Sequence, residues 1–319
     1  MQLRTLGMSD LKISPILMGT WQAGKEMWVG IDDAQSTRAI RAAVETGVTT
    51  FDTAAAYGKG HSERILGAAL ADVRTEVILA TKVFANRLKF NQVIGSCHQS
   101  LKNLKTDYID LYQIHWPAGS FGTRSVPIEE TLAAMNELKE KGEIRAIGVS
   151  NFSCNQLEEA TRYARIDSLQ SPYSLIWRHV EGDVMSYCRE NDISILAYSP
   201  MAQGLLSGKF AQGHKFEKGD HRAKNKLFEP ENFQRVRQAL DRLRPIAEKN
   251  AVSLAQLALA WVLSHTNTYA IAGARNADQV VQNARAAALD LSENDLGRMD
   301  EIGRLVTDYL DKNPVLWGA

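Results

Sequence analysis

The chain has 319 residues, of which 45% are hydrophobic and 23% charged, a composition typical of globular proteins. Its 37 Lys and Arg residues balance its 37 Asp and Glu residues, so no net charge attracts it to nucleic acid or to an anionic membrane surface. No window approaches the ~18 consecutive apolar residues of a membrane-spanning helix. We therefore expect neither nucleic acid nor membrane as a partner.

The cysteines and the first residues indicate the compartment. Cys97, Cys154 and Cys188 are far apart and form no C-x-x-C pair, so neither a disulfide framework nor a metal site is predicted. Residues 1–10 (MQLRTLGMSD) contain no apolar core of a secretory signal. These features predict a cytoplasmic protein, and the sequence favours no particular oligomeric state.

Eight short apolar runs alternate with longer segments of helical period. The runs are Ile13–Gly19, Val48–Asp52, Val77–Val83, Asp110–Trp116, Arg145–Ser150, Ser168–Ser171, Ser194–Ser199 and Tyr269–Ala272. Amphipathic segments such as 33–47 and 128–142 separate them and end in glycine, and two helical segments, 231–250 and 252–265, separate the last two runs.

This alternation, with no linker between halves, predicts a single (β/α)8 barrel domain over residues 1–319. A short hairpin turning at residues 7–10 is expected before the first barrel strand. The segment after Arg304 belongs to no βα unit and is expected to form an extra C-terminal helix or tail.

Ionisable side chains follow three neighbouring strands, near the ends where such barrels carry their chemistry. Asp52 ends the second run, and Tyr57 lies in the loop after it, in the segment FDTAAAYGKG. Lys82 lies in the third run and His115 in the fourth. Each residue alone has an ordinary explanation as a cap, a loop residue or a core histidine. Four of them on one rim predict a catalytic site.

These four side chains suit one kind of proton transfer. A tyrosine holds its proton at neutral pH because its pKa is near ~10, and a nearby cation lowers that pKa. We expect Lys82 to supply the cation, Asp52 to hold Lys82 in place, and Tyr57 to donate a proton to a developing alkoxide. His115 would orient the substrate oxygen or share the proton. The reaction then needs a hydride donor.

A dinucleotide would have to bind without the glycine-rich fingerprint of a Rossmann fold. The segment 58–60 (GKG) begins such a pattern, but Glu63 occupies the position of its third glycine and the βαβ context is missing. The later strand ends are polar instead. Ser150, Asn151 and Gln170 suit a carboxamide, which needs both donors and acceptors.

The last two strand ends suit the rest of a dinucleotide. Tyr198 could stack on an aromatic ring, and the loop with Gly204, Gly208 and Lys209 could cradle a pyrophosphate. Arg275 precedes a predicted helix in the segment AGARNADQ, and a helix N-terminus beside an arginine is a natural phosphate site.

Six segments, in this order, are similar to the aldo-keto reductases: FDTAAAYGKGHSE, ILATKV, LYQIHWP, IGVSNF, AYSPMAQGLLSGKF and GARNADQVVQN. The resemblance covers residues 1–290. It implies a barrel that binds NADPH in an extended form and reduces aldehydes, with ketones and dicarbonyls as further candidates, to alcohols by hydride transfer. Asp52, Tyr57, Lys82 and His115 match the family's catalytic tetrad, with Tyr57 as the general acid.

The resemblance also implies binding residues for the cofactor. They are Trp21, Asp52, Ser150, Asn151, Gln170, Tyr198, Ser199, Pro200, Met201, Gly204, Lys209, Arg222, Gly273, Arg275, Gln279 and Asn283. Aromatic side chains near the exits of the first and fourth strands could line an apolar substrate pocket, for which we expect Trp21, Trp28, Tyr57, Phe84, His115 and Trp116.

The adenosine end resembles the bacterial and channel-β-subunit branches of the family more than the mammalian steroid and aldose reductases. Gly273-Ala274 replaces the Lys-Ser pair of those enzymes. Arg275 is then the main candidate for binding a 2′-phosphate, so NADPH is expected as the cofactor and NADH is less favoured.

Two features keep alternatives open. Residues 207–230 are rich in charge and glycine, which is typical of a solvated loop, but they could also form a lid over the cofactor. Trp28 could line the pocket or pack beneath a loop, and His214 and His221 are expected at the surface.

A second class of function is a regulatory subunit that binds NADP as a redox sensor with little turnover. The presence of all four catalytic side chains favours turnover instead. A hydrolytic barrel would need a second carboxylate at the mouth, and the strand ends offer none.

Overall fold

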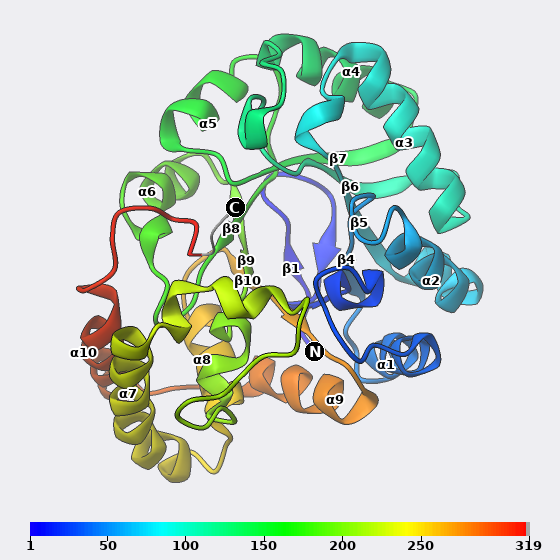
Figure 1. The fold of residues 1–319 in the computed structure, drawn as a ribbon. Helices are drawn as coiled ribbons and strands as arrows, with labels where there is room; N and C mark the ends of the chain where they lie inside the picture. The colour runs from blue at the N-terminus through cyan, green and yellow to red at the C-terminus, as the bar shows by residue number, and fades with distance from the viewer. Residues whose placement is uncertain (317–319) are drawn as a thin grey trace.

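The computed structural model describes residues 1–316, and its centre is a closed barrel of eight parallel strands (Figure 1). The strands are β3 (Ile16–Gly19), β4 (Thr50–Asp52), β5 (Ile78–Val83), β6 (Ile109–Ile114), β7 (Ile144–Ser150), β8 (Ser168–Pro172), β9 (Ser194–Tyr198) and β10 (Thr268–Gly273). Each strand pairs with the next, and β10 pairs with β3. The predicted (β/α)8 barrel is confirmed.

Helices surround the strands when the molecule is seen along the barrel axis (Figure 1). They are α1 (Asp33–Glu45), α2 (His61–Ala69), α3 (Phe90–Leu104), α4 (Ile128–Glu140), α5 (Cys154–Ala160), α6 (Asp183–Glu190), α7 (Pro230–Lys249), α8 (Leu254–Leu263), α9 (Ala277–Arg285) and α10 (Glu293–Thr307). The extra helix α10 packs against α7, and residues 308–316 follow it as a tail. The last three residues of the predicted tail lie outside the described residues. Within residues 1–316 no helix has the length and apolar character needed to cross a membrane.

Polar residues at the helix starts explain where several helices begin. The Asp32 carboxylate accepts a hydrogen bond from the Gln35 N–H at 2.8 Å and so caps α1. Ser153 and Ser253 begin α5 and α8 with capping boxes, in which the serine and a glutamine three residues later satisfy each other's backbone N–H groups.

A hairpin of β1 (Arg4–Thr5) and β2 (Lys12–Ile13) precedes the barrel, as predicted. Its apolar side chains pack with the interior of the barrel, and the Gly7 N–H donates to Ser194 Oγ at 2.7 Å. The predicted first strand began at Ile13, which was wrong by three residues. Ile13 belongs to the hairpin because Pro15, which has no N–H for a ladder, separates it from β3.

The alternation of side chains along the strands decides which polar groups reach the barrel interior. In β6, Leu111 packs inside the barrel, whereas Tyr112 and Ile114 pack between the strands and the helices. Gln113 therefore faces inward with Leu111. Its register partner on β5 is Lys82, so an amide and an ammonium are neighbours inside the barrel.

Candidate active site

A buried ion pair lies at the centre of the site. Lys82 Nζ is 2.7 Å from Asp52 Oδ2, and the two side chains are 0% and 4% exposed. The ammonium also donates to the Thr53 carbonyl oxygen at 2.8 Å. A lysine has three N–H donors, so one remains without a hydrogen-bond partner within residues 1–316.

Two side-chain amides donate hydrogen bonds to Asp52 Oδ1, the carboxylate oxygen that does not face Lys82. Gln170 Nε2 donates to Asp52 Oδ1 at 2.8 Å, and Gln113 Nε2 donates to the same oxygen at 3.4 Å. A Cβ added at Gly148 would lie 2.9 Å from Gln113 Cγ, so this glycine leaves room for the amide. Sequence reasoning did not single out Gln113, although a glutamine within an apolar strand was a usable signal.

Tyr57 and His115 complete the group. Tyr57 lies in the turn after β4, and its ring centroid is 5.2 Å from Lys82 Nζ. His115 directly follows β6, and its ring meets the Tyr57 ring edge-on with centroids 5.7 Å apart. The structure thus brings together the four side chains singled out at the strand ends.

Burial sets the protonation states of these groups. It raises the pKa of Tyr57 well above the ordinary value, and the Asp52 charge raises it further. Burial lowers the pKa of Lys82, against the attraction of Asp52, and burial together with the Lys82 charge lowers the pKa of His115 well below the ordinary value. Lys82 was expected to lower the pKa of Tyr57, but this pKa is raised, first because burial disfavours the phenolate and then because the Asp52 charge repels it.

Asn151 joins three strand ends. Its backbone is left-handed, with a φ of 62°, a conformation that asparagine tolerates better than most residues. Its Nδ2 donates to the His115 carbonyl oxygen at 3.1 Å and to Ser150 Oγ at 2.9 Å, and its Oδ1 accepts from the Tyr198 hydroxyl at 2.9 Å. Asn151 therefore fixes Tyr198 relative to His115.

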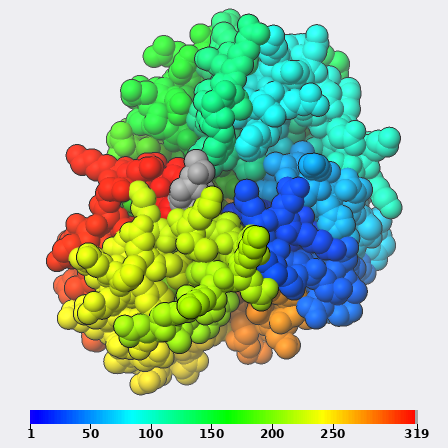
Figure 2. All heavy atoms as spheres, in the orientation of Figure 1, coloured from blue at the N-terminus to red at the C-terminus, as the bar shows by residue number. Residues whose placement is uncertain are grey.

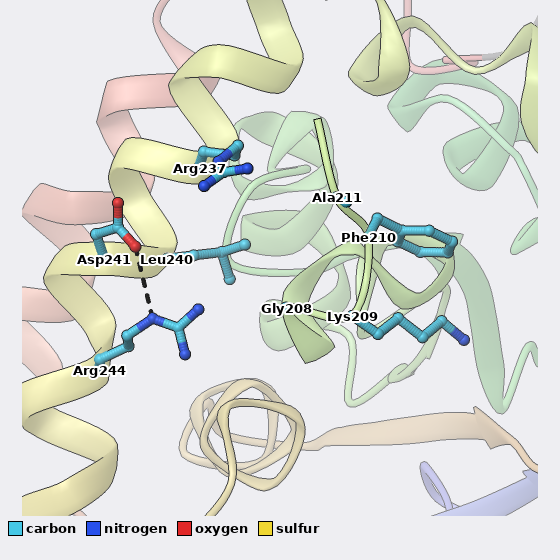
Figure 3. A pocket seen from close by; sticks show the side chains of 8 residues that line it. All are labelled: Gly208, Lys209, Phe210, Ala211, Arg237, Leu240, Asp241 and Arg244. Atoms are coloured by element: carbon cyan, nitrogen blue, oxygen red, sulfur yellow. Dashed lines mark hydrogen bonds and ion pairs between the residues drawn. The ribbon is translucent and has the colours of Figure 1, made fainter. Parts of the chain in front are cut away.

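Three cations lie close together. Lys209 follows the 3-10 helix η6 (Ala202–Ser207), Arg222 lies in η7 (His221–Lys224), and Arg275 follows β10. Burial, and then the charges of Arg222 and Arg275, lower the pKa of Lys209. The Lys209 side chain points away from Arg237 and Arg244 of α7 (Figure 3), and a Cβ at Gly204 would lie 3.5 Å from Lys209 Nζ.

Arg222 is buried in the 207–230 segment. Its Nε donates to Asp220 Oδ1 at 2.9 Å, and its Nη2 donates to Asp220 Oδ2 at 2.5 Å. The guanidinium carbon also lies 5.0 Å from the Trp28 ring centroid, 5.6 Å from that of Phe210 and 5.0 Å from that of Phe216. One ion pair and three aromatic rings thus order this segment.

His221 connects the 207–230 segment to the loop after β3. Its ring centroid is 4.4 Å from that of Trp21 and 4.7 Å from that of Trp28, and its Nδ1 lies 3.0 Å from the Met27 carbonyl oxygen. The expected surface position of His221 was wrong, because these rings bury half of it; His214 is exposed. Figure 2 shows the yellow-green segment against the blue N-terminal part of the chain on this face.

The residues expected at the adenosine end mostly bind one another. Gln279 Oε1 accepts from the Arg275 backbone N–H at 2.8 Å, and Asn283 Nδ2 donates to the Gly273 carbonyl oxygen at 3.4 Å. Arg275 also faces the Trp28 ring at 5.7 Å. Trp28 therefore lies beside these cations. The expected residues Ser199, Pro200 and Met201 lie in the turn between β9 and η6.

Aromatic rings form a wall beside His115. The Phe84 ring meets His115 edge-on at 5.6 Å and stacks on Phe121 at 5.8 Å. Trp116 meets Phe121 edge-on at 5.0 Å. Sequence reasoning missed Phe121, whose only signal was an aromatic side chain between two glycines in the loop after the fourth barrel strand.

A sequence model of the Aldo/keto reductase family matches residues 15–304. The chain belongs to the aldo/keto reductase family. It is 37% identical to the aldo-keto reductase YhdN of Bacillus subtilis (strain 168), covering 92% of this chain and 91% of the relative. It is 33% identical to the NADH-specific methylglyoxal reductase of Escherichia coli (strain K12), covering 93% and 97%. The crystal structure of an aldo-keto reductase from Klebsiella pneumoniae in complex with NADPH superposes with a TM-score of 0.78 at 28% identity, covering 100% of this chain and 99% of that one.

Burial of a neutral His115 predicts that this aldo/keto reductase loses stability in acid. Below about pH 6.5 the unfolded imidazole binds a proton, whereas the folded one, with its lowered pKa, does not. The free energy of unfolding should then fall by up to ~1.4 kcal/mol per pH unit from this residue alone. Urea unfolding of the wild type and His115→Asn at pH 7.5, 6.0 and 5.0 measures the effect. Between pH 7.5 and 5.0 the free energy of unfolding should fall less in His115→Asn than in the wild type. Equal falls would contradict a neutral, buried His115.

Proposed function

We propose that this chain is an NADPH-dependent carbonyl oxidoreductase that reduces aldehydes to alcohols, with ketones or dicarbonyls as further substrates. The observation that carries the proposal is the buried Lys82–Asp52 pair beside the rings of Tyr57 and His115. The relative named as a methylglyoxal reductase and the similar structure in complex with NADPH support the same chemistry.

In this proposal Tyr57 is the proton donor. Its raised pKa keeps the phenol protonated until a substrate oxygen gains negative charge. The remaining N–H donor of Lys82 would then stabilise the phenolate as the proton leaves, and Asp52 keeps the ammonium charged and in position. His115, neutral because of its lowered pKa, would hold the carbonyl oxygen by a hydrogen bond.

The polar strand ends fit the nicotinamide carboxamide. Gln170 Nε2 donates a hydrogen bond to Asp52. Gln170 Oε1 accepts no hydrogen bond from residues 1–316, so it would be able to accept one from the amide N–H of the carboxamide. Tyr198, fixed by Asn151, would support the ring. When bound, the cofactor supplies the hydride.

The cation cluster fits the phosphates. Burial and then the charges of Arg222 and Arg275 lower the pKa of Lys209, and burial and then the charge of Arg222 lower the pKa of Arg275. An anion between these cations would relieve the repulsion. Gln203 Nε2 is buried without a hydrogen-bond partner in the described residues, next to Gly204 in the same loop. Buried donors are rarely left unpaired, so this amide would donate to a phosphate oxygen.

Arg275 supports NADPH over NADH, because its half-buried guanidinium would bind a 2′-phosphate. The NADH-specific relative makes the comparison of both cofactors part of the test.

The proposal predicts carbonyl-dependent oxidation of NADPH by the purified protein, faster than that of NADH. Tyr57→Phe should reduce turnover on the order of 10²–10⁴-fold, because it removes the general acid while keeping the ring. Tyr163→Phe, at an exposed tyrosine outside the site, should keep the wild-type rate. Absorbance at 340 nm measures the oxidation of NADPH or NADH by the wild type, Tyr57→Phe and Tyr163→Phe. Near-wild-type turnover by Tyr57→Phe would remove Tyr57 from the role assigned to it.

A redox sensor with little turnover is the second candidate. It is favoured by the contacts that hold the 207–230 segment in place. The contacts of Arg222 and His221 would hold this segment as a lid and slow cofactor release. A lid that never opens during a reaction cycle suits sensing, whereas one that opens in each cycle suits an enzyme.

Arg222→Ala tests the lid. Loss of the guanidinium removes both the ion pair with Asp220 and the contacts to three rings, so NADPH should dissociate at least several-fold faster. Stopped-flow fluorescence measures the rate, and Lys224→Ala, an exposed cation of the same short helix, is the control. Identical dissociation rates in the wild type and Arg222→Ala would show that the segment is only a surface loop.

A further inference from the structure

Glu63 is a buried carboxylate that the proposed reaction does not use. It belongs to the first turn of α2 and is 0% exposed. No lysine, arginine or histidine of residues 1–316 forms an ion pair with it. Burying a charge without a counter-ion costs free energy, so stability alone does not explain this carboxylate.

Two hydrogen bonds favour the ionised form of Glu63. Thr81 Oγ1 donates to one carboxylate oxygen at 2.7 Å, and Asn103 Nδ2 donates to the other at 2.7 Å. The positive end of the α2 dipole also favours a negative charge in the first turn. A Cβ added at Gly60 would lie 2.4 Å from Asn103 Nδ2, so this glycine leaves room for the amide.

Glu63 lies on the other side of β5 from the Lys82–Asp52 pair. Successive residues of a strand point to opposite faces, so Thr81 faces the helices, whereas Lys82 faces the barrel interior. The helices α2 and α3, which supply Glu63 and Asn103, pack side by side outside the barrel (Figure 1). The Lys82 ammonium therefore has one carboxylate beside it in the barrel and a second one behind its own strand.

Inside the barrel, one negative charge faces the ammonium. The ionisable side chains beside Lys82 are Asp52, Tyr57 and His115. The raised pKa of Tyr57 and the lowered pKa of His115 keep both of them neutral. Burial lowers the pKa of Lys82, and the charge of Asp52, followed by that of Glu63, raises it. Both carboxylates therefore act against loss of the ammonium proton.

Two further ionisable groups face the Glu63 charge on the outer side of the barrel. They are Cys97 of α3 and Tyr112 of β6. Burial, and then nearby carboxylates that include Glu63, raise the pKa of Cys97 to about 12. Burial is also the main reason that the pKa of Tyr112 lies well above its ordinary value. Both groups are neutral at neutral pH, so neither gives Glu63 a counter-ion.

We propose that Glu63 is a positioning residue whose charge, placed behind β5, keeps Lys82 an ammonium ion for the proton transfer from Tyr57. This inference rests on the proposed reductase function and adds a residue that acts through Lys82 rather than on the reacting atoms. Asp52 supports the ammonium but also repels a Tyr57 phenolate. A second carboxylate outside the barrel supports the ammonium without adding a charge to the barrel interior.

The titration of Lys82 tests the proposal in the protein without cofactor or substrate. Lysine labelled with 13C at Cε reports its own protonation by NMR from pH 7 to about 10.5, and Lys82→Met assigns the signal. Glu63→Gln keeps the size of the side chain and removes its charge, so the midpoint of the Lys82 titration should move to lower pH. Glu143→Gln is the control, because Glu143 acts on Cys97 but is not among the charges that raise the pKa of Lys82.

The same variants show whether this charge matters for the reaction. Single-turnover reduction of a saturating aldehyde by the NADPH complex is followed from pH 7 to about 9.5. The rate of Glu63→Gln should decline at lower pH than that of the wild type and be several-fold smaller at the alkaline end, because Lys82 loses its proton sooner. NADPH affinity should change little, and Glu143→Gln should keep the wild-type pH profile.

A purely structural role of Glu63 gives a different result. Lower thermal stability of Glu63→Gln with an unmoved Lys82 midpoint would overturn the proposal. If that variant does not fold, Glu63→Leu combined with Thr81→Val replaces the charge and its hydroxyl partner by apolar groups. The Lys82 midpoint should again move to lower pH, and an unmoved midpoint overturns the proposal there too. If the wild type reduces no aldehyde, the proposed function fails, and the Lys82 titration alone decides whether Glu63 keeps the ammonium charged.

Discussion

The buried pair of Lys82 and Asp52 determines how the mouth of this barrel is built. Removing one partner of a buried pair typically costs about 3–5 kcal/mol, because the other charge stays buried alone. Asp52 therefore takes hydrogen bonds from Lys82, Gln113 and Gln170, which come from three different strands. Apolar residues of similar volume would pack at least as well. Stability alone does not explain the pair; in the proposed function it holds a cation beside the proton donor Tyr57.

The same pair explains the electrostatics around it. Burial raises the pKa of Tyr57, and the Asp52 charge, which repels a phenolate, raises it further. Burial, and then the Lys82 charge, lower the pKa of His115. The result is two neutral groups, a phenol and an imidazole, beside one balanced ion pair. In the proposed function, such a site keeps its protons until charge develops on a bound oxygen.

How much the sequence could predict depends on the periodicity around each residue. Lys82 and His115 lie in or next to strands whose alternation and ends are readable, so their convergence could be predicted. Phe121 and His221 lie in loops, where no periodicity indicates which way a side chain points. The direction of the Tyr57 pKa was also out of reach, because burial depends on how the loops around the mouth pack. Most of the site features that the sequence could not predict therefore lie in irregular segments of the chain.

The most direct test of this account is the single-turnover reduction of a saturating aldehyde by the NADPH complex of Lys82→Met, with NADPH affinity measured on the same preparation. We expect the affinity to stay close to that of the wild type, which also shows that the barrel is folded. The rate should fall by on the order of 10²-fold or more, because Tyr57 loses the cation that stabilises it as a phenolate. A near-wild-type rate would contradict the central role given to the Lys82–Asp52 pair.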